Sequence, residues 1–416
     1  MGTKSLGTTL YRLIDVVLAL FLILNCQSVY QNSVGVNYFV YEITALLIVL
    51  SAVVKFGCNG ICNSKFKFFI AFFCFYFLYL ALMIIFSVEK SLIVSFLGRY
   101  GLLPFVVFTF LLDLPAKDKY YVFKKFADLV AVITFISIFF WLFGSTLKIL
   151  KPNSLFSYDW GQTVSVNSYY GLYFETQFVD WIGIDWFYRN TSIFVEGPMF
   201  CLVLILAIMF ILTCPTEFKH KKIELAVLCI GLITTFSTTG LLFLGLLVLL
   251  YFYKEPKLRI FLLIILPVTI IAGIYFLIKK SGTGSFFLRL DDYVAGFKTW
   301  ISKPLFGYGF GKFDAVIENM SRDDNIGFSN SIFAVLVQGG IVYGLLFIVP
   351  IFYGIMSGIK KKQRRLLFLS LCYALLFVLI VFQTAFINLY IWTCIFSFPV
   401  KNGEKKKYEI MPLCGK

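Results

Sequence analysis

The sequence predicts an all-α polytopic membrane protein with about twelve transmembrane helices and both termini in the cytoplasm. Hydrophobic residues make up 60% of the 416 positions and charged residues only 14%, which differs strongly from a soluble domain. The apolar residues are grouped in runs of membrane-spanning length, and every second loop between the runs is basic. We therefore expect residues 1–416 to form a single integral membrane domain.

Apolar runs predict the helices in order along the chain. Nine runs are long enough to cross about 30 Å of hydrocarbon as a helix: 10–27, 38–54, 68–86, 92–112, 127–147, 194–213, 260–278, 331–353 and 366–382. Three shorter runs cover 223–236, 240–253 and 386–400. They also count as spans, because a turn at 237–240 keeps the basic loop after residue 253 on the inner side.

Charge sets the predicted orientation of these helices. The inner loops and tails contain 25 Lys and Arg against 9 Asp and Glu, whereas the outer segments contain 11 and 12. This asymmetry follows the positive-inside rule. The net charge of +15 comes from these short clusters, so we expect no nucleic-acid partner. The first run continues past Cys26 without a cleavage site and predicts a retained span.

Two long polar segments, 148–193 and 279–330, fall on the outer side and are too long to be simple connectors. We expect amphipathic helices and the functional residues there. The first segment is rich in aromatic residues, which either stack on sugars or form an interfacial belt; the belt is the favoured interpretation for most of them. In the second segment, apolar residues at helical spacing over 290–301 predict a helix along the membrane surface. Its other face shows Arg289, Asp292 and Thr299.

Ionisable residues near the predicted outer membrane surface are the first candidates for a site. Arg189 and Glu196 flank the start of the run at 194–213, and Pro198 suits the first turn of a helix there. This pair is either a structural salt bridge or a site for an anionic group. Arg99 lies within the fourth predicted span and either pairs with Glu42 or faces a polar cavity.

No segment of the sequence has the residue spacing of a nucleotide-binding loop or of a cysteine metal site. The glycine-rich stretch around Tyr308 lacks the P-loop pattern, because Phe306 and Phe313 occupy the required positions, so it predicts a tight turn. Cys58 and Cys62 do not have metal-site spacing. We therefore expect no cofactor and no metal.

Any general base on the outer face must be a carboxylate. The only histidine, His220, belongs to a predicted cytoplasmic basic cluster, so it is not available there. The remaining base candidates are ten carboxylates: Glu175, Asp180, Asp185, Glu196, Asp291, Asp292, Asp314, Glu318, Asp323 and Asp324.

Four segments, taken in order, resemble the O-antigen polymerase and O-antigen ligase superfamily of bacterial envelope glycosyltransferases. They are 189–200 (RNTSIFVEGPMF), 234–242 (TTFSTTGLL), 289–311 (ending PLFGYGFG) and 329–341, which begins with Ser-Asn-Ser. Gly197 interrupts the Glu-Pro pair of the family pattern, Thr238 stands where many members have Arg, and Ser329 replaces a histidine. Ligases of the family use that histidine, so its absence favours a repeat-unit polymerase and leaves the general base unassigned.

The resemblance implies a metal-independent glycosyltransferase of the bacterial cytoplasmic (inner) membrane. It transfers a growing glycan from undecaprenyl pyrophosphate to a hydroxyl of another lipid-linked repeat unit, building O-antigen or capsule on the outer face. Arg189 and Arg289 would clamp the pyrophosphate and Glu196 would activate the acceptor hydroxyl. The expected substrate-binding residues are Asn330, Arg99 and Tyr308. The expected partners are the lipid-linked oligosaccharide donor and acceptor, membrane lipids and a chain-length regulator protein.

Three alternatives remain open at this stage. The first is ligase-type oligosaccharide transfer. The second is a lipid-linked oligosaccharide flippase or another transporter, which predicts short loops and charged residues deep within several spans; this chain shows the reverse. The third is a membrane protein with a purely structural or partner-binding role.

Overall fold

The computed structural model describes residues 2–34, 37–179, 187–214, 218–254, 284–322 and 327–399. Helices make up 69% of the structure, so the predominantly helical fold class is confirmed. Six helical segments are long and apolar enough to cross a membrane: Leu6–Leu24, Phe39–Cys58, Asn63–Ser87, Lys90–Leu111, Tyr121–Thr146 and Ser331–Lys360. The predicted span at 260–278 lies outside the described residues.

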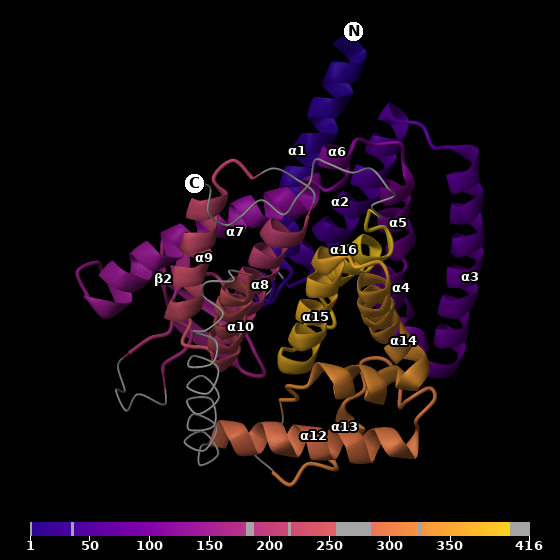
Figure 1. Cartoon of the computed structure of the whole chain (residues 1–416). Coiled ribbons are helices and arrows are strands. Elements are labelled where there is room, and N and C mark those ends of the chain that lie inside the picture. The colour runs from indigo at the N-terminus through magenta and orange to yellow at the C-terminus, as the bar shows by residue number, and fades with distance from the viewer. Residues whose placement is uncertain are drawn as a thin grey trace.

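The N-terminal half supplies most of the long helices (Figure 1). They are α1 (Gly2–Leu24), α2 (Asn37–Cys58), α3 (Asn63–Ser87), η1 (Lys90–Leu92), α4 (Ile93–Tyr100), α5 (Leu103–Leu111), α6 (Ala116–Lys119), α7 (Tyr121–Phe140) and the π-helical turn η2 (Trp141–Thr146). α1 packs against both α2 and α7, and α5 packs against α2. The first five predicted spans therefore each contain a helix.

The C-terminal half contains the longest described helix, α14, together with shorter helices and one transverse helix. They are α8 (Gly197–Thr213), α9 (Lys221–Thr234), α10 (Thr238–Lys254), α12 (Gly284–Ser302), α13 (Asp314–Ile317), α14 (Ser331–Lys360), α15 (Arg364–Leu379) and α16 (Ile387–Phe396). Residues 235–237 separate α9 from α10, so the predicted break between two helices is confirmed. α12 runs across the ends of the other helices, at the end of the molecule opposite the N-terminus (Figure 1).

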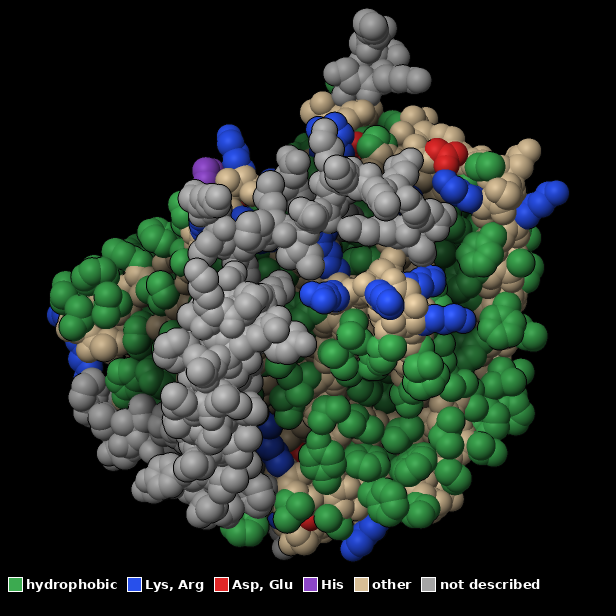
Figure 2. Space-filling view, viewed as in Figure 1, with side chains coloured by type: hydrophobic (Ala, Val, Ile, Leu, Met, Phe, Trp, Pro, Cys, Tyr) green, Lys and Arg blue, Asp and Glu red, His purple; other side chains and the backbone are tan. Residues whose placement is uncertain are grey.

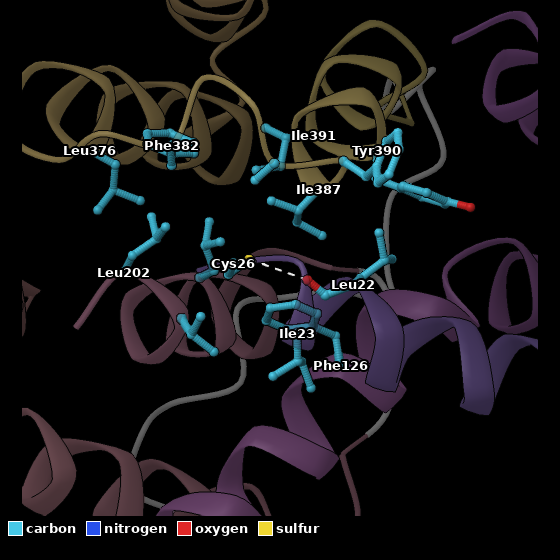
Figure 3. Close-up of a cluster of buried hydrophobic side chains, with 14 of the residues drawn as sticks. Leu22, Ile23, Cys26, Phe126, Leu202, Leu376, Phe382, Ile387, Tyr390 and Ile391 are labelled. Atoms are coloured by element: carbon cyan, nitrogen blue, oxygen red, sulfur yellow. Dashed lines mark hydrogen bonds between the residues drawn. The ribbon is translucent and has the colours of Figure 1, made fainter. Parts of the chain in front are cut away.

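α8 is the central helix, because its sequence is apolar on every side and a helix of this kind must be buried. Every residue from Met199 to Ile211 is buried, and α7, α9, α10 and α15 pack around it. Figure 3 shows Leu202 of α8 in the same cluster as Phe126 of α7 and Ile387 of α16. Glu196, the residue that precedes α8, is therefore attached to the most buried helix of the described structure.

Large apolar side chains cover the outside of the helices, as lipid contact requires. Phe75 of α3 is 73% exposed and Phe352 of α14 is 64% exposed. Figure 2 shows hydrophobic side chains over α3, α14 and α15, with Lys and Arg side chains gathered above them on the side of the N-terminus. This arrangement supports a membrane protein whose basic end is the end that contains the N-terminus.

The described part of the first segment predicted to lie outside contains a small antiparallel sheet. Its strands are β1 (Ser154–Asp159), β2 (Thr163–Tyr169) and β3 (Tyr173–Phe174), in the order β1-β2-β3. No helix occurs in the described residues between η2 and α8, so the prediction of an amphipathic helix in this loop is wrong. The sequence Thr-Val-Ser-Val-Asn-Ser-Tyr alternates with the period of a strand, and the glycines after β1 and β2, at 161 and 171, have φ of +72° and +69°.

The sheet is attached to the membrane helices through the segment after α1. Ser33 pairs with Tyr158, Ser28 pairs with Phe194, and the Asp159 amide donates to the Asn32 carbonyl over 2.7 Å. Four aromatic side chains of this loop are buried: Tyr158, Tyr169, Tyr173 and Phe174. The interfacial-belt interpretation is therefore wrong for these four, because they form the core of the loop.

The glycine-rich segment closes a break in α14. The backbone leaves the helical conformation at Gly339 and Gly340, where polar groups need new partners. The amide of Tyr308 donates to the Val337 carbonyl over 2.7 Å, and the amide of Gly309 donates to the Gln338 carbonyl over 3.0 Å. A Cβ on Gly340 would lie 2.2 Å from the Leu305 backbone. The predicted tight turn is confirmed and acts as a backbone support.

Candidate functional site

The first fixed point of the candidate site is Glu196, the residue immediately before α8. The extended segment before Glu196 is hydrogen-bonded to the chain after α1: the Val195 amide donates to the Gln27 carbonyl over 3.2 Å. Helix α8 begins at Gly197, so Glu196 lies outside the helix. Its carboxylate makes no capping hydrogen bond with α8. The Gly197 amide instead donates to Oε1 of Gln177 over 3.1 Å, which leaves the carboxylate available for other chemistry.

Arg189 approaches Glu196 from the preceding loop. Its Nε donates to the Phe178 carbonyl over 3.0 Å. A Cβ on Gly197 would lie 3.4 Å from Cδ of Arg189 and 3.2 Å from the Thr235 carbonyl oxygen. The glycine that interrupts the family pattern therefore allows α8, Arg189 and the turn between α9 and α10 to meet closely.

Asn190 joins that turn to the Arg189 loop. Its amide donates to the Thr234 carbonyl over 3.0 Å, and its Nδ2 donates to Oγ1 of Thr234 over 3.0 Å. Asn190 is fully buried, and its Oδ1 accepts hydrogen bonds from the Ser137 hydroxyl and the Ser192 amide. Two segments that are distant in the sequence, 189–197 and 234–237, are thus held together by buried hydrogen bonds.

Arg289 brings α12 into the same site. Burial raises the pKa of Glu196 above its ordinary value, and the positive charges of Arg289 and Arg189 both act in the opposite direction. Both guanidinium groups therefore lie close enough to interact electrostatically with this carboxylate. We call Glu196 and these two arginines the loop site; their catalytic role stays a prediction.

Tyr158 is a fourth member that the sequence did not single out. Its side chain is 3% exposed, and burial together with the negative charge of Glu196 raises the pKa of Tyr158 to about 12. Its hydroxyl is therefore protonated at neutral pH and can donate a hydrogen bond. In the sequence it is one of many loop aromatics, and only the register of β1 brings it to this position.

α12 exposes its apolar face and buries its polar face. Tyr293, Val294 and Phe297 are 37%, 44% and 47% exposed, whereas Asp292 and Thr299 are almost fully buried. This distribution agrees with the predicted helix along the membrane surface, because the apolar side chains remain available to lipid.

Residues that follow α12 in the chain form ion pairs and hydrogen bonds with its polar side chains. Arg322 binds Asp291 over 2.8 Å and Asp292 over 2.5 Å. The Ser329 hydroxyl donates to Oδ2 of Asp292 over 2.6 Å. These contacts fix α12, and with it Arg289, against the start of α14.

Asn330 is a helix cap in this structure. Its Oδ1 accepts a hydrogen bond from the Phe333 amide over 3.1 Å, the side chain is 2% exposed, and its Nδ2 has no hydrogen-bond partner among the described residues. No contact with Glu196, Arg189 or Arg289 is present in the described structure. Its predicted contact with a sugar stays a prediction.

Arg99 occupies a different environment, which we call the aromatic cage. Its Nε donates to the Tyr41 hydroxyl over 3.2 Å, and its guanidinium carbon lies 5.6 Å from the Tyr41 ring centroid and 5.3 Å from that of Phe310. Glu42 is exposed and forms no ion pair with Arg99 within the described chain, so the alternative of a pair with Glu42 is wrong. The predicted role of Arg99 in substrate binding has no support from these contacts.

Tyr308 also lies away from the loop site. Its hydroxyl is 3.1 Å from Oγ of Ser302, and the Lys303 ammonium lies 4.3 Å from its ring centroid. Ser302 ends α12, so its distance from Arg289 along the helix axis is about 20 Å at 1.5 Å per residue. The structure does not bring Tyr308 together with the predicted catalytic residues.

The other base candidates of the predicted outer segments differ from Glu196. Glu175 accepts hydrogen bonds from Ser145, Tyr169 and Asn167, and Asp291 and Asp292 are bound by Arg322. Asp314 and Glu318 are exposed. Four of the predicted candidates lie outside the described residues: Asp180, Asp185, Asp323 and Asp324. Among the described carboxylates of the outer segments, Glu196 combines a raised pKa with two neighbouring arginines.

The ionisable residues of the described ranges form no cluster of three or more His, Cys, Asp or Glu able to hold a metal ion. Comparison with protein-family models, with curated proteins and with solved structures finds no match for this chain. Arguments about function therefore rest on the geometry of the loop site.

Proposed function

We propose that this protein polymerises undecaprenyl-pyrophosphate-linked oligosaccharide repeat units into a surface polysaccharide, O-antigen or capsule, on the outer face of the bacterial cytoplasmic membrane. The observation that supports this proposal is that the positive charges of Arg189 and Arg289 both act on the carboxylate of Glu196, beside the start of a buried helix. In this proposal the chain has about twelve spans with both termini in the cytoplasm, and it belongs to the polymerase and ligase superfamily that its motifs resemble.

The arrangement suits transfer of a sugar from a pyrophosphate. The acceptor hydroxyl oxygen attacks the anomeric carbon of the donor glycan, and the bond from that carbon to the pyrophosphate oxygen breaks. The bonding electrons move to the pyrophosphate, whose growing negative charge Arg189 and Arg289 stabilise. The proton of the acceptor hydroxyl moves to Glu196, which its raised pKa makes a stronger base than an ordinary glutamate.

Helix α8 adds to this electrostatic arrangement. Its N-terminal end carries partial positive charge and lies directly after Glu196. Pro198, within the first turn, has no amide hydrogen to leave unpaired. The Tyr158 hydroxyl, which stays protonated at neutral pH, supplies a further donor for a phosphate or sugar oxygen.

We prefer polymerisation over ligase-type transfer because residue 329 is not a histidine. The histidine that ligases of the resembled family use is a serine here, and that serine is hydrogen-bonded to Asp292. It contributes to the position of α12 and is not offered to a substrate. Glu196 fills the role of base in this proposal.

The test is extension of a purified lipid-linked repeat unit by the purified protein in proteoliposomes. We expect a ladder of lipid-linked products from the wild type and single units from Arg289→Ala. Lys298→Ala is the matched control, because Lys298 is an exposed basic residue on the same helix, and it should give the wild-type ladder. Movement of the lipid-linked unit across the membrane without extension would replace the proposal with a flippase.

A further inference from the structure

A buried polar cluster lies beside the loop site and joins helices α7 and α9 to the loop before α8. We call it the asparagine cluster and define it by Ser137 of α7, Asn190 of the loop and Thr234, the last residue of α9. Ser137 and Asn190 are fully buried, and Thr234 is 7% exposed. Buried polar groups are costly unless they are hydrogen-bonded, and a satisfied network of this kind fixes the geometry of the segments that it joins.

The hydrogen bonds of the cluster fix the orientation of the Asn190 side chain. The Ser192 amide can only donate, so Oδ1 of Asn190 must be the atom that accepts from it, over 3.2 Å. The Ser137 hydroxyl donates to the same oxygen. Nδ2 then faces Thr234 and donates to its Oγ1 over 3.0 Å, and the Thr234 hydroxyl donates to the Gly231 carbonyl over 2.9 Å. Reversal of the Asn190 amide would set two donors against each other at Ser192.

Strained backbone occurs on both segments that the cluster joins. Ser192 and Phe236 have φ of +53° and +48°, in the left-handed region that residues with a side chain rarely adopt. The surroundings hold both residues. The Ser192 amide is bound by Asn190, and the Phe236 ring packs against Phe187 and Trp141 at centroid distances of 5.3 Å and 6.3 Å. Strain of this kind persists where the structure over-determines the geometry, which is typical of functional sites.

The asparagine cluster sets the position of Arg189, the neighbour of Asn190 in the chain. The Arg189 amide donates to the Gln177 carbonyl over 2.9 Å, and the Asn190 amide donates to the Thr234 carbonyl over 3.0 Å. The Arg189 side chain is bound through Nε, which donates to the Phe178 carbonyl over 3.0 Å. Because the guanidinium group is planar from Nε outwards, these contacts together fix the direction of its charge.

We propose that Asn190 is a positioning residue of the loop site: through Ser137 and Thr234 it holds Arg189 to α7 and α9, so that the guanidinium group meets the leaving pyrophosphate in one geometry. The proposal rests on the proposed function, because that function gives Arg189 its role. Asn190 acts through Arg189 and needs no contact with the substrate. Misplacement of a stabilising group by about 1 Å lowers a rate by up to about 100-fold, so loss of one of these hydrogen bonds should slow the transfer.

The experiment measures chain extension per folded protein in proteoliposomes, over a range of lipid-linked substrate concentrations. Thr234→Val retains the shape of threonine but removes the acceptor for Asn190 Nδ2, whereas Thr234→Ser keeps the hydroxyl. We expect Thr234→Val to lower kcat at least about fivefold with KM within about twofold, and Thr234→Ser to extend at the wild-type rate. Ser137→Ala should lower kcat less, about twofold to threefold, because the Ser192 amide still binds Oδ1.

Two comparisons separate positioning from a purely structural role. Thr213→Val is the matched control, because Thr213 is also buried and its hydroxyl donates to the Met209 carbonyl over 2.7 Å. It ends α8, about 24 Å from the first residue of that helix, and the variant should extend at the wild-type rate. In the Arg189→Lys background, Thr234→Val should change kcat less than about twofold, because lysine lacks the Nε contact through which the cluster acts.

Hydrogen–deuterium exchange on the same preparations measures the hold on the loop without any activity. Residues 189–195 should exchange at least about fivefold faster in Thr234→Val than in the wild type, and at the wild-type rate in Thr213→Val. Three results would overturn the proposal: unchanged exchange in Thr234→Val, unchanged kcat in that variant, or an equal loss of kcat in the Arg189→Lys background. Absence of extension by the wild type would refute the proposed function and with it the role of Asn190, while exchange would still report the hold of the cluster on the loop.

Discussion

The loop site and the aromatic cage hold arginines in opposite environments. At the loop site, the charges of Arg189 and Arg289 act on the partly exposed carboxylate of Glu196. In the aromatic cage, Arg99 lies within α4, between the rings of Tyr41 and Phe310, with no carboxylate contact in the described residues. Cation–π contacts and a hydroxyl satisfy Arg99, whereas the charges of Arg189 and Arg289 act on a carboxylate. We therefore propose a catalytic role for the arginines of the loop site and a structural role for Arg99.

The largest effect is expected from Arg289→Ala. Loss of one charged donor to the leaving group should reduce the rate of glycan transfer by at least about 100-fold. Membrane insertion should be unchanged, because Arg322 and Asp292 hold α12 independently of Arg289. The measurement is the rate of chain extension at saturating lipid-linked substrate. A rate within threefold of the wild type would remove Arg289 from the mechanism.

Replacement of Arg189 separates charge from geometry. Arg189→Lys retains the positive charge but loses the planar two-pronged donor and the hydrogen bond to the Phe178 carbonyl. We expect about one tenth of wild-type activity from Lys and no measurable extension from Gln. Chain-length distributions on gels compare the two variants at equal protein levels. Equal activity of Lys and Gln would contradict an electrostatic role.

The pH dependence of extension reports on Glu196. Glu196 acts as a base only when deprotonated, so activity should rise with pH through its pKa. Because burial raises that pKa, the half-point should lie above the ordinary value of about 4.3 for glutamate. Rates measured across pH with wild type and Glu196→Gln test this expectation. A half-point at or below the ordinary value, or an unchanged acid limb in Glu196→Gln, would exclude Glu196 as the base.

The smallest effect on catalysis is expected from Arg99→Lys. The change loses the hydrogen bond to Tyr41 and weakens the ring contacts, so the thermal midpoint should fall by a few degrees, about 1 kcal/mol of stability. The KM for the lipid-linked substrate should stay within twofold. Scanning fluorimetry and initial-rate kinetics on the same preparation give both values. A raised KM at unchanged thermal midpoint would instead place a substrate group at the aromatic cage.

The sequence was sufficient for the features that follow from hydrophobicity. The apolar run at 194–213 predicted α8, and Pro198 marked its first turn. The break between α9 and α10 followed from charge alone. These predictions succeeded because lipid and buried surroundings act on every residue of a helix in the same way.

Features that depend on contacts between distant segments could not be predicted from hydrophobicity. The sheet of the first loop was missed because its strands are short, although the alternation in β2 and the glycines at 161 and 171 were visible signals. The position of Tyr158 beside Glu196 depends on strand register, which one sequence does not specify. The sugar-binding role of Asn330 was inferred from the resemblance and stays a prediction, whereas its role as the cap of α14 depends on the hydrogen bond from the Phe333 amide.

The central claim is that Arg189, Arg289 and Glu196 form one catalytic site, and single-turnover release of undecaprenyl pyrophosphate tests it most directly. The purified protein is mixed with a stoichiometric donor and an excess of acceptor, and the released lipid pyrophosphate is followed in time. We predict release coupled one-to-one to extension in the wild type, and loss of both in Arg289→Ala and Glu196→Gln. Release and extension at wild-type rates in either variant would contradict the account.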